Sequence, residues 1–141
     1  MTAGSNDENA GRAAFEPILI SIPEDMTPPP AAVPGAPFIG EAEEAVDIRG
    51  VRLFMHVFDA RLRSASLRSS RFTIEPGCGT HEDRHAVREI WFVSQGQLEV
   101  CYDGECYRVE AGQALFFEPW RPHFTRNIGV ERAEIFSVWW A

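Results

Sequence analysis

The stretch HEDRHAVREIWFVSQGQ, residues 81–97, decides the fold because it joins a charged half to an apolar half. Asp83, His85 and Glu89 recur at even spacings, so an extended chain places all three on one side. The run IWFV, residues 90–93, then continues as an apolar strand. A buried carboxylate is costly unless a cation or dense hydrogen bonding compensates it. These polar side chains therefore either face water or converge on a group that compensates their burial.

Outward from this stretch, the chain reads as a series of short strands separated by turn residues. The expected strands, all between residues 51 and 140, are 51–59, 66–74, 88–94, 97–102, 105–110, 113–118, 123–127 and 131–140. The expected strands are separated by the segments QG, DG, AG, EPWRP and IG, whose glycines and prolines are typical of turns. This pattern predicts an all-β sandwich or barrel, and a barrel of about eight strands can enclose one small ligand.

The first part of the chain has a different character. Residues 1–16 are polar, acidic and aperiodic, and residues 23–37 contain several prolines, which predicts an extended linker. Between them, PILISI (17–22) predicts a short apolar strand. We therefore expect a flexible, acidic and Pro-rich N-terminal arm over residues 1–49 and a barrel over 50–141. A tethered apolar strand has little to pack against within one small barrel, which predicts a homodimer.

Composition and charge exclude several classes of function. The net charge of −8 argues against nucleic acid and against anionic membranes as partners. No apolar run is long enough to span a bilayer, and the N-terminus lacks the layout of a signal peptide, which favours a cytoplasmic location. All 13 basic residues are Arg, so no lysine is available for a Schiff base.

Two of the three cysteines flank a predicted hairpin turn. Asp103-Gly104 is a strong two-residue turn, which would place Cys101 opposite Cys106 on neighbouring strands. A strained disulfide between them is one alternative. In a reduced cytoplasm, however, we expect two small buried thiols.

Two motifs across these strands match a known family. The first, G-x5-H-x-H-x3-E-x6-G, is matched at every spacing by Gly77, Asp83, His85, Glu89 and Gly96, with Asp83 in place of the first histidine. The second, G-x5-P-x-G-x2-H-x3-N, is matched more loosely from Gly104, with Glu110 in place of the proline and the ending His123-x3-Asn127. Residues 50–140 therefore resemble the cupin superfamily, and the resemblance implies a double-stranded β-helix, or jelly-roll, barrel.

The resemblance also implies a metal site. In cupins the two motifs face each other inside the barrel, so His85, Glu89 and His123 are expected to converge on one ion. Asp83, or His81 from the preceding loop, is then a fourth ligand or a catalytic base. Histidine and carboxylate ligands suit a divalent transition metal, and two His with one carboxylate form the facial triad of non-haem Fe(II) oxygenases. Fe2+ is favoured, with Zn2+, Mn2+ or Ni2+ as alternatives.

Three functions remain open. The sequence favours a metal-dependent enzyme that acts on a small organic molecule, as a non-haem Fe(II) oxygenase or dioxygenase. The alternative enzyme is a redox-neutral isomerase, cyclase or lyase that uses Zn, Ni or Mn. The third reading is a non-catalytic module that binds a sugar or another metabolite, because one fold hosts many functions.

The substrate pocket has five further candidates: His56, Arg52, Phe54, Trp91 and Arg121. Residues 51–57 alternate, which places Arg52, Phe54 and His56 on one face. That face either lines the pocket or forms a dimer surface. Trp91 belongs to the barrel wall, and Arg121 lies where cupins have the mouth of the barrel.

Overall fold

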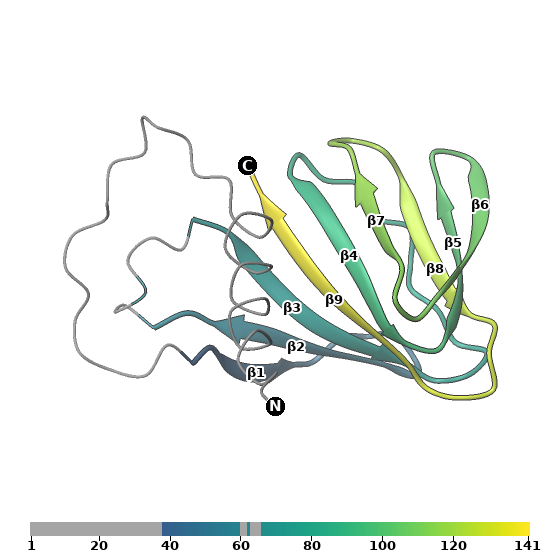
Figure 1. Ribbon diagram of the computed structural model, residues 1–141, viewed down its shortest axis with the longest axis horizontal. Coiled ribbons are helices and arrows are strands. Elements are labelled where there is room, and N and C mark those ends of the chain that lie inside the picture. Colours follow the sequence, from purple (N-terminus) through teal and green to yellow (C-terminus); the bar gives the residue numbers. More distant parts are fainter. Residues whose placement is uncertain (1–37, 60–61, 63–65) are drawn as a thin grey trace, which may run out of the picture. The chain divides into compact units, whose positions relative to one another are not determined.

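The computed structural model describes residues 38–59, 62 and 66–141. In this part of the chain the strands form two antiparallel sheets, and no residue is helical (Figure 1). The strands are β1 (Gly40–Glu44), β2 (Val51–Val57), β3 (Arg68–Ile74), β4 (Arg88–Gln95), β5 (Gln97–Tyr102), β6 (Glu105–Glu110), β7 (Ala114–Phe117), β8 (His123–Asn127) and β9 (Ala133–Trp140). The all-β prediction is therefore confirmed. The described part of the chain accordingly contains no helix that could cross a membrane.

The two sheets enclose a common core. The larger sheet has the order β1-β2-β3-β9-β4-β7 and the smaller sheet the order β6-β5-β8. Strand alternation sends Leu98 and Val100 of β5 inward, where both are fully buried, and they join Ile74 and Ile135 of the larger sheet in one cluster. Burial of each such side chain contributes roughly 1.5–3 kcal/mol, so the alternating apolar pattern holds the two layers together.

Strand β1 changes the predicted boundary of the arm. The sequence assigns residues 40–44 to the flexible arm, but they pair with β2 along the whole length of β1. Arginines of neighbouring strands hold its acidic side chains: Arg52 Nε donates to Glu43 and Arg71 Nε donates to Glu41, each at 2.9 Å. The predicted strand 17–22 and the linker 23–37 lie outside the described residues.

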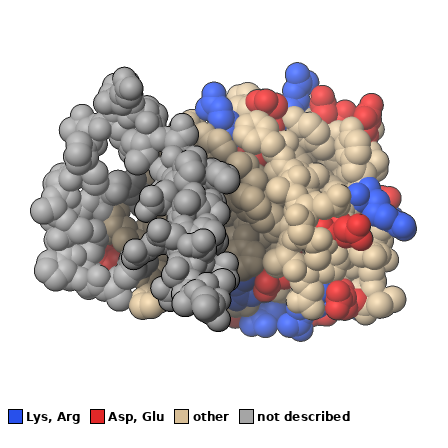
Figure 2. Space-filling view, in the orientation of Figure 1, with Lys and Arg blue, Asp and Glu red and all other residues tan. Residues whose placement is uncertain are grey.

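Charged side chains are unevenly distributed on the surface. In the view of Figure 2, they lie mostly along the borders of the described part, with an uncharged area between them. Phe92 and Phe116, on β4 and β7, are both close to half exposed. Phe116 also contacts the ring of Trp140 on β9. The outer face of the larger sheet is thus partly apolar. Nothing in a single chain tests whether a second copy covers this face, so the homodimer stays a prediction.

The β5–β6 hairpin corrects the expectation of free thiols. Asp103 and Gly104 both have positive φ, as a type I′ turn requires. This turn places Cys101 directly opposite Cys106, with their Cα atoms 3.9 Å apart. The two cysteines form a disulfide, because the register brings both sulfur atoms to the same side of the hairpin. Cys78 is a free thiol.

Asn127, the last residue of the second motif, ties the fold together and does not line the cavity described below. Its Nδ2 donates to the carbonyls of Ile74 and Glu131, each at 2.8 Å, and its Oδ1 accepts from Gly129 N–H at 2.9 Å. The side chain is buried. A buried backbone group that loses its partner costs the full desolvation penalty, so this one amide stabilises three connections.

We therefore expect Asn127→Ala to lower the free energy of unfolding by about 2–4 kcal/mol, because it removes the partners of three backbone groups. Urea denaturation measures the change. Arg126→Ala is the matched control on the same strand: its exposed ion pair with Glu99, at 3.3 Å, is worth at most about 1 kcal/mol. Equal losses in the two variants would contradict the role of the amide.

Candidate metal centre

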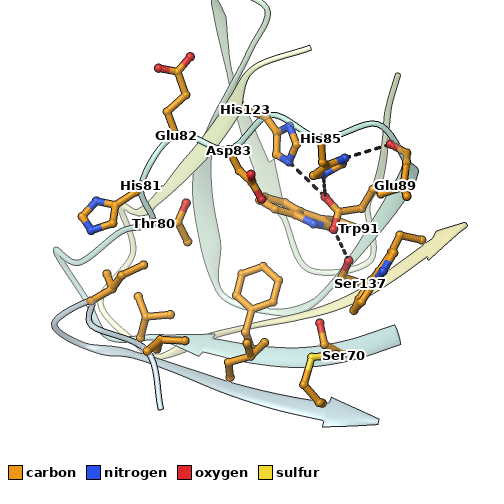
Figure 3. A pocket seen from close by; sticks show the side chains of 18 residues that line it. Ser70, Thr80, His81, Glu82, Asp83, His85, Glu89, Trp91, His123 and Ser137 are labelled. Carbon is orange, nitrogen blue, oxygen red and sulfur yellow. Dashed lines mark hydrogen bonds and ion pairs between the residues drawn. The ribbon is translucent and has the colours of Figure 1, made fainter. Parts of the chain in front are cut away.

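The polar residues of both motifs converge on the wall of one cavity (Figure 3). His85 precedes β4, Glu89 lies within β4, and His123 is the first residue of β8. The Nε2 atoms of His85 and His123 lie 3.3 Å and 3.1 Å from the same atom, Glu89 Oε1. Two imidazoles and one carboxylate, drawn from both sheets, therefore meet at a single point.

A backbone bridge places Asp83 beside His123. Asp83 N–H donates to His123 O at 2.9 Å, and His123 N–H donates to Asp83 O at 3.0 Å. A second bridge joins Gly79 to Arg126, where an added Cβ would lie only 2.5 Å from the Thr125 carbonyl oxygen. Only glycine allows this approach. The loop that carries Asp83 is thereby fixed along β8.

Backbone carbonyls orient both imidazoles. His85 Nδ1 donates to the carbonyl of Val87 at 3.0 Å, and His123 Nδ1 donates to the carbonyl of Arg121 at 3.0 Å. A histidine that donates through Nδ1 presents Nε2 as the atom that can bind a metal. Both Nε2 atoms point toward Glu89 (Figure 3). This arrangement of donors fits a transition-metal ion.

Glu89 has a second anchor in Ser137 of β9, whose Oγ donates to Oε2 at 2.6 Å. Burial acts to raise the pKa of Glu89, but hydrogen bonds from His123 and Ser137 and the charges of both histidines hold it below its usual value. Burial acts to lower the pKa of His123, but the hydrogen bonds to Glu89 and Arg121 O and the nearby carboxylates raise it. Each of the two residues thus favours the charged form of the other.

Asp83 completes the set of ligand candidates. Asp83, His85 and His123 each offer a ligand atom, and these atoms lie within 4.8 Å of one another. The Asp83 side chain accepts a hydrogen bond from the backbone N–H of Arg84 at 2.7 Å. Together with Glu89, these residues give two nitrogen and two carboxylate donors, which suit Fe, Mn, Zn or Ni.

The cavity beside these residues has a volume of about 610 Å³, and His81 and Trp91 line it as well. Trp91 is buried, and its ring lies edge-on to His123, with centroids 5.6 Å apart. His81 is exposed at the same cavity. The structure thus brings His81, Asp83, His85, Glu89, Trp91 and His123 together around one space.

The remaining pocket candidates lie elsewhere, and their assignment is corrected. Arg52, Phe54 and His56 are on the face of β2 that points away from the cavity, and the cavity-lining residues of this strand are Val51, Leu53 and Met55. His56 lies instead within hydrogen-bond distance of Ser69 and within 3.4 Å of Glu41. Arg121 pairs with Asp103 at the surface and serves the site through its carbonyl oxygen.

Sequence reasoning missed Ser137 and the two loop residues Val46 and Ile48, which also line the cavity. Ser137 carried a signal: on the alternating strand β9 it is the polar residue on the inward face between Ile135 and Trp139. Val46 and Ile48 were assigned to the arm and gave no comparable signal.

Two antiparallel sheets around a core, with a histidine–carboxylate cluster on the inner wall, define a double-stranded β-helix barrel with a candidate metal centre. The family model described as "Cupin domain" matches residues 70–139, which include Gly77, Glu89 and His123. This chain belongs to the cupin superfamily.

Solved structures of similar fold support this assignment. A Cupin 2 conserved barrel domain protein from Salinispora arenicola is 24% identical, covers 70% of this chain and 87% of its own, and has a TM-score of 0.58. A predicted oxalate decarboxylase from Thermotoga maritima is 20% identical over 72% and 91%, with a TM-score of 0.58. The Cupin_2 domain of an XRE family transcriptional regulator from Enterobacter cloacae is 22% identical over 66% and 98%, with a TM-score of 0.56. At these identities the likeness shows the fold alone.

We expect His123→Ala to lower metal affinity by more than about 100-fold, since even loss of a group that only orients a ligand costs about 10- to 100-fold. Metal content after gel filtration measures it. His56→Ala is the control, because it removes a hydrogen-bonded histidine outside the cavity and should leave metal content unchanged. Full metal content in His123→Ala would remove this residue from the site.

Ser137→Ala tests the anchor of Glu89. Loss of its hydrogen bond at 2.6 Å should weaken metal binding by about 10-fold, because the carboxylate is no longer held in position. Titration against a competing chelator measures the affinity. Ser94→Ala, which removes a serine–carboxylate hydrogen bond to Glu134 at the surface, should have no effect. Equal affinities in the two variants would show that Ser137 is not needed.

Proposed function

We propose that this cupin is a metal-dependent enzyme that acts on a small organic molecule, as a non-haem Fe(II) oxygenase. The observation that carries the proposal is the approach of His85 Nε2 and His123 Nε2 to Glu89 Oε1, at 3.3 Å and 3.1 Å. Two histidines and one carboxylate are the facial triad of Fe(II) oxygenases. Such a triad would leave room for O2 and for a substrate at a bound ion.

The protein supplies position and shielding, and bound Fe2+ would supply the activation of O2. His85, Glu89 and His123 would hold the ion, and the carbonyls of Val87 and Arg121 keep both imidazoles turned toward Glu89. The cavity of about 610 Å³ beside the triad lies within the range of roughly 300–1,000 Å³ usual for small-molecule sites.

A redox-neutral reaction is the second candidate, and the position of Asp83 favours it. Its carboxylate lies in the cavity within 4.8 Å of both histidine ligand atoms, and His81 lines the same space. A carboxylate there can accept a proton from a substrate whose carbonyl is polarised by Zn2+, Ni2+ or Mn2+. Isomerisation, cyclisation and elimination all need such a base.

Metal analysis of protein purified without added metal, combined with O2 uptake over a panel of small organic substrates, tests the proposal. Iron with substrate-dependent uptake supports the oxygenase. Zinc, nickel or manganese without uptake supports the redox-neutral enzyme. Protein that binds no metal even after reconstitution contradicts both and favours a non-catalytic module that binds a sugar or another metabolite.

Asp83→Asn separates a ligand from a base. We expect the variant to keep its metal and to lose about 10²–10⁴-fold in turnover, because the triad holds the ion while the amide cannot accept a proton. His81→Ala is the control on the same loop, and it should keep both metal and most activity. The assignment fails if Asp83→Asn empties the site, or if His81→Ala empties it while Asp83→Asn stays active.

The partner and location of the enzyme remain proposals. We keep a homodimer, a small-molecule substrate and a cytoplasmic location, with no nucleic acid or membrane partner, in accord with the net charge of −8. Light scattering of the full chain tests the dimer.

A further inference from the structure

The cavity differs in chemistry between its two sides, and this difference defines a class of substrate. We propose that it binds a molecule with one metal-chelating polar end and a non-polar body, and that it disfavours small dianions. The inference rests on the proposed function for the chelating end. The non-polar body is inferred from walls that take no part in holding the ion.

One side of the cavity is mostly apolar, with Ser70 of β3 as a polar member. It is formed by β2, β3 and the loop between β1 and β2, through Val46, Ile48, Val51, Leu53, Met55 and Phe72. The ligand candidates come from β4, β8 and the loop before β4 (Figure 3). An alkyl or aryl group that is removed from water against these six side chains gains affinity in proportion to its buried area.

Apart from the histidines, the charged residues among the described lining of the cavity are all acidic. Glu82, Asp83 and Glu89 line it, and no arginine is among the described lining residues. A divalent ion would be neutralised by Asp83 and Glu89, so a dianion would add two negative charges with no cation to pair them. An unpaired charge in a partly buried site is strongly disfavoured. A neutral or monoanionic chelating group does not meet this penalty.

Trp91 contributes ring surface to the cavity. It is 5% exposed, it lines the cavity, and its ring lies edge-on to His123, with centroids 5.6 Å apart. The indole thus adds apolar surface beside the ligand candidates.

The test is binding to zinc-loaded protein, measured by titration calorimetry, because zinc is redox-inert and no turnover interferes. The probes are acetohydroxamate and octanohydroxamate, which share a monoanionic chelating group and differ only in alkyl chain, together with oxalate. Octanohydroxamate should bind at least about 30-fold more tightly than acetohydroxamate, since each buried methylene contributes several-fold. Oxalate should bind more weakly than octanohydroxamate.

Variants locate the effect. Val46→Asn, in a half-buried loop position, and Leu53→Asn, in β2, should each reduce the preference for the long chain by about 10-fold or more, and acetohydroxamate should bind nearly as it does to the unaltered protein. Val57→Asn is the control, because Val57 lies on the same strand as Leu53, is 52% exposed and does not line this cavity.

The possible results distinguish a failure of this inference from a failure of the proposed function. Bound zinc with equal affinity for the two hydroxamates, or tighter binding of oxalate, overturns this inference and leaves the metal centre in place. Protein that cannot be loaded with zinc or iron contradicts the proposed function and this inference together. A chain-length preference that survives both Val46→Asn and Leu53→Asn overturns the assignment of the apolar wall.

Discussion

The buried carboxylate of Glu89 is the group on which the site depends. Burial penalises its charge, and the compensation comes from elements far apart in the chain: His85 before β4, His123 on β8 and Ser137 on β9. Two of these strands belong to the larger sheet and one to the smaller sheet. The charge can therefore be satisfied only when both sheets are assembled, which couples the local chemistry to the completed barrel.

Backbone hydrogen bonds set the positions of the ligands. Asp83 and His123 exchange two backbone hydrogen bonds, and Gly79 lies so close to the Thr125 carbonyl that a Cβ would not fit. These two contacts hold the first motif against β8. Side-chain rotamers are then fixed by the Nδ1 contacts of His85 and His123 to carbonyls. Such preorganisation lowers the entropy lost when an ion or substrate binds, and it depends on strand pairing that is present throughout the barrel.

Sequence reasoning located the ligand candidates because period-two spacing and a family motif coincide at residues 83–89. It could not choose the face of β2, since Val51, Leu53 and Met55 oppose a face that contains Phe54 and is also partly apolar. The choice depends on β1, whose acidic residues Glu41 and Glu43 pair with arginines of the outer face. GEAEE has no apolar alternation, so only this long-range pairing identifies it as a strand. The Cys101–Cys106 disulfide was also missed. The turn predicted correctly that the two cysteines lie opposite each other, but the assumption of a reducing cytoplasm led to the prediction of free thiols.

The same pairing explains why no arginine is among the described residues that line the cavity. Arg52 and Arg71 are held on the outside of β2 and β3 by the carboxylates of β1, and Arg71 also stacks on Phe54 at 4.1 Å from the ring centroid. With the arginines outward, alternation sends only apolar residues of β2 inward. The charge preference of the cavity is thus a consequence of how the edge strand is attached. An acidic edge strand, although it is remote from the ligands, determines which molecules can lie beside them.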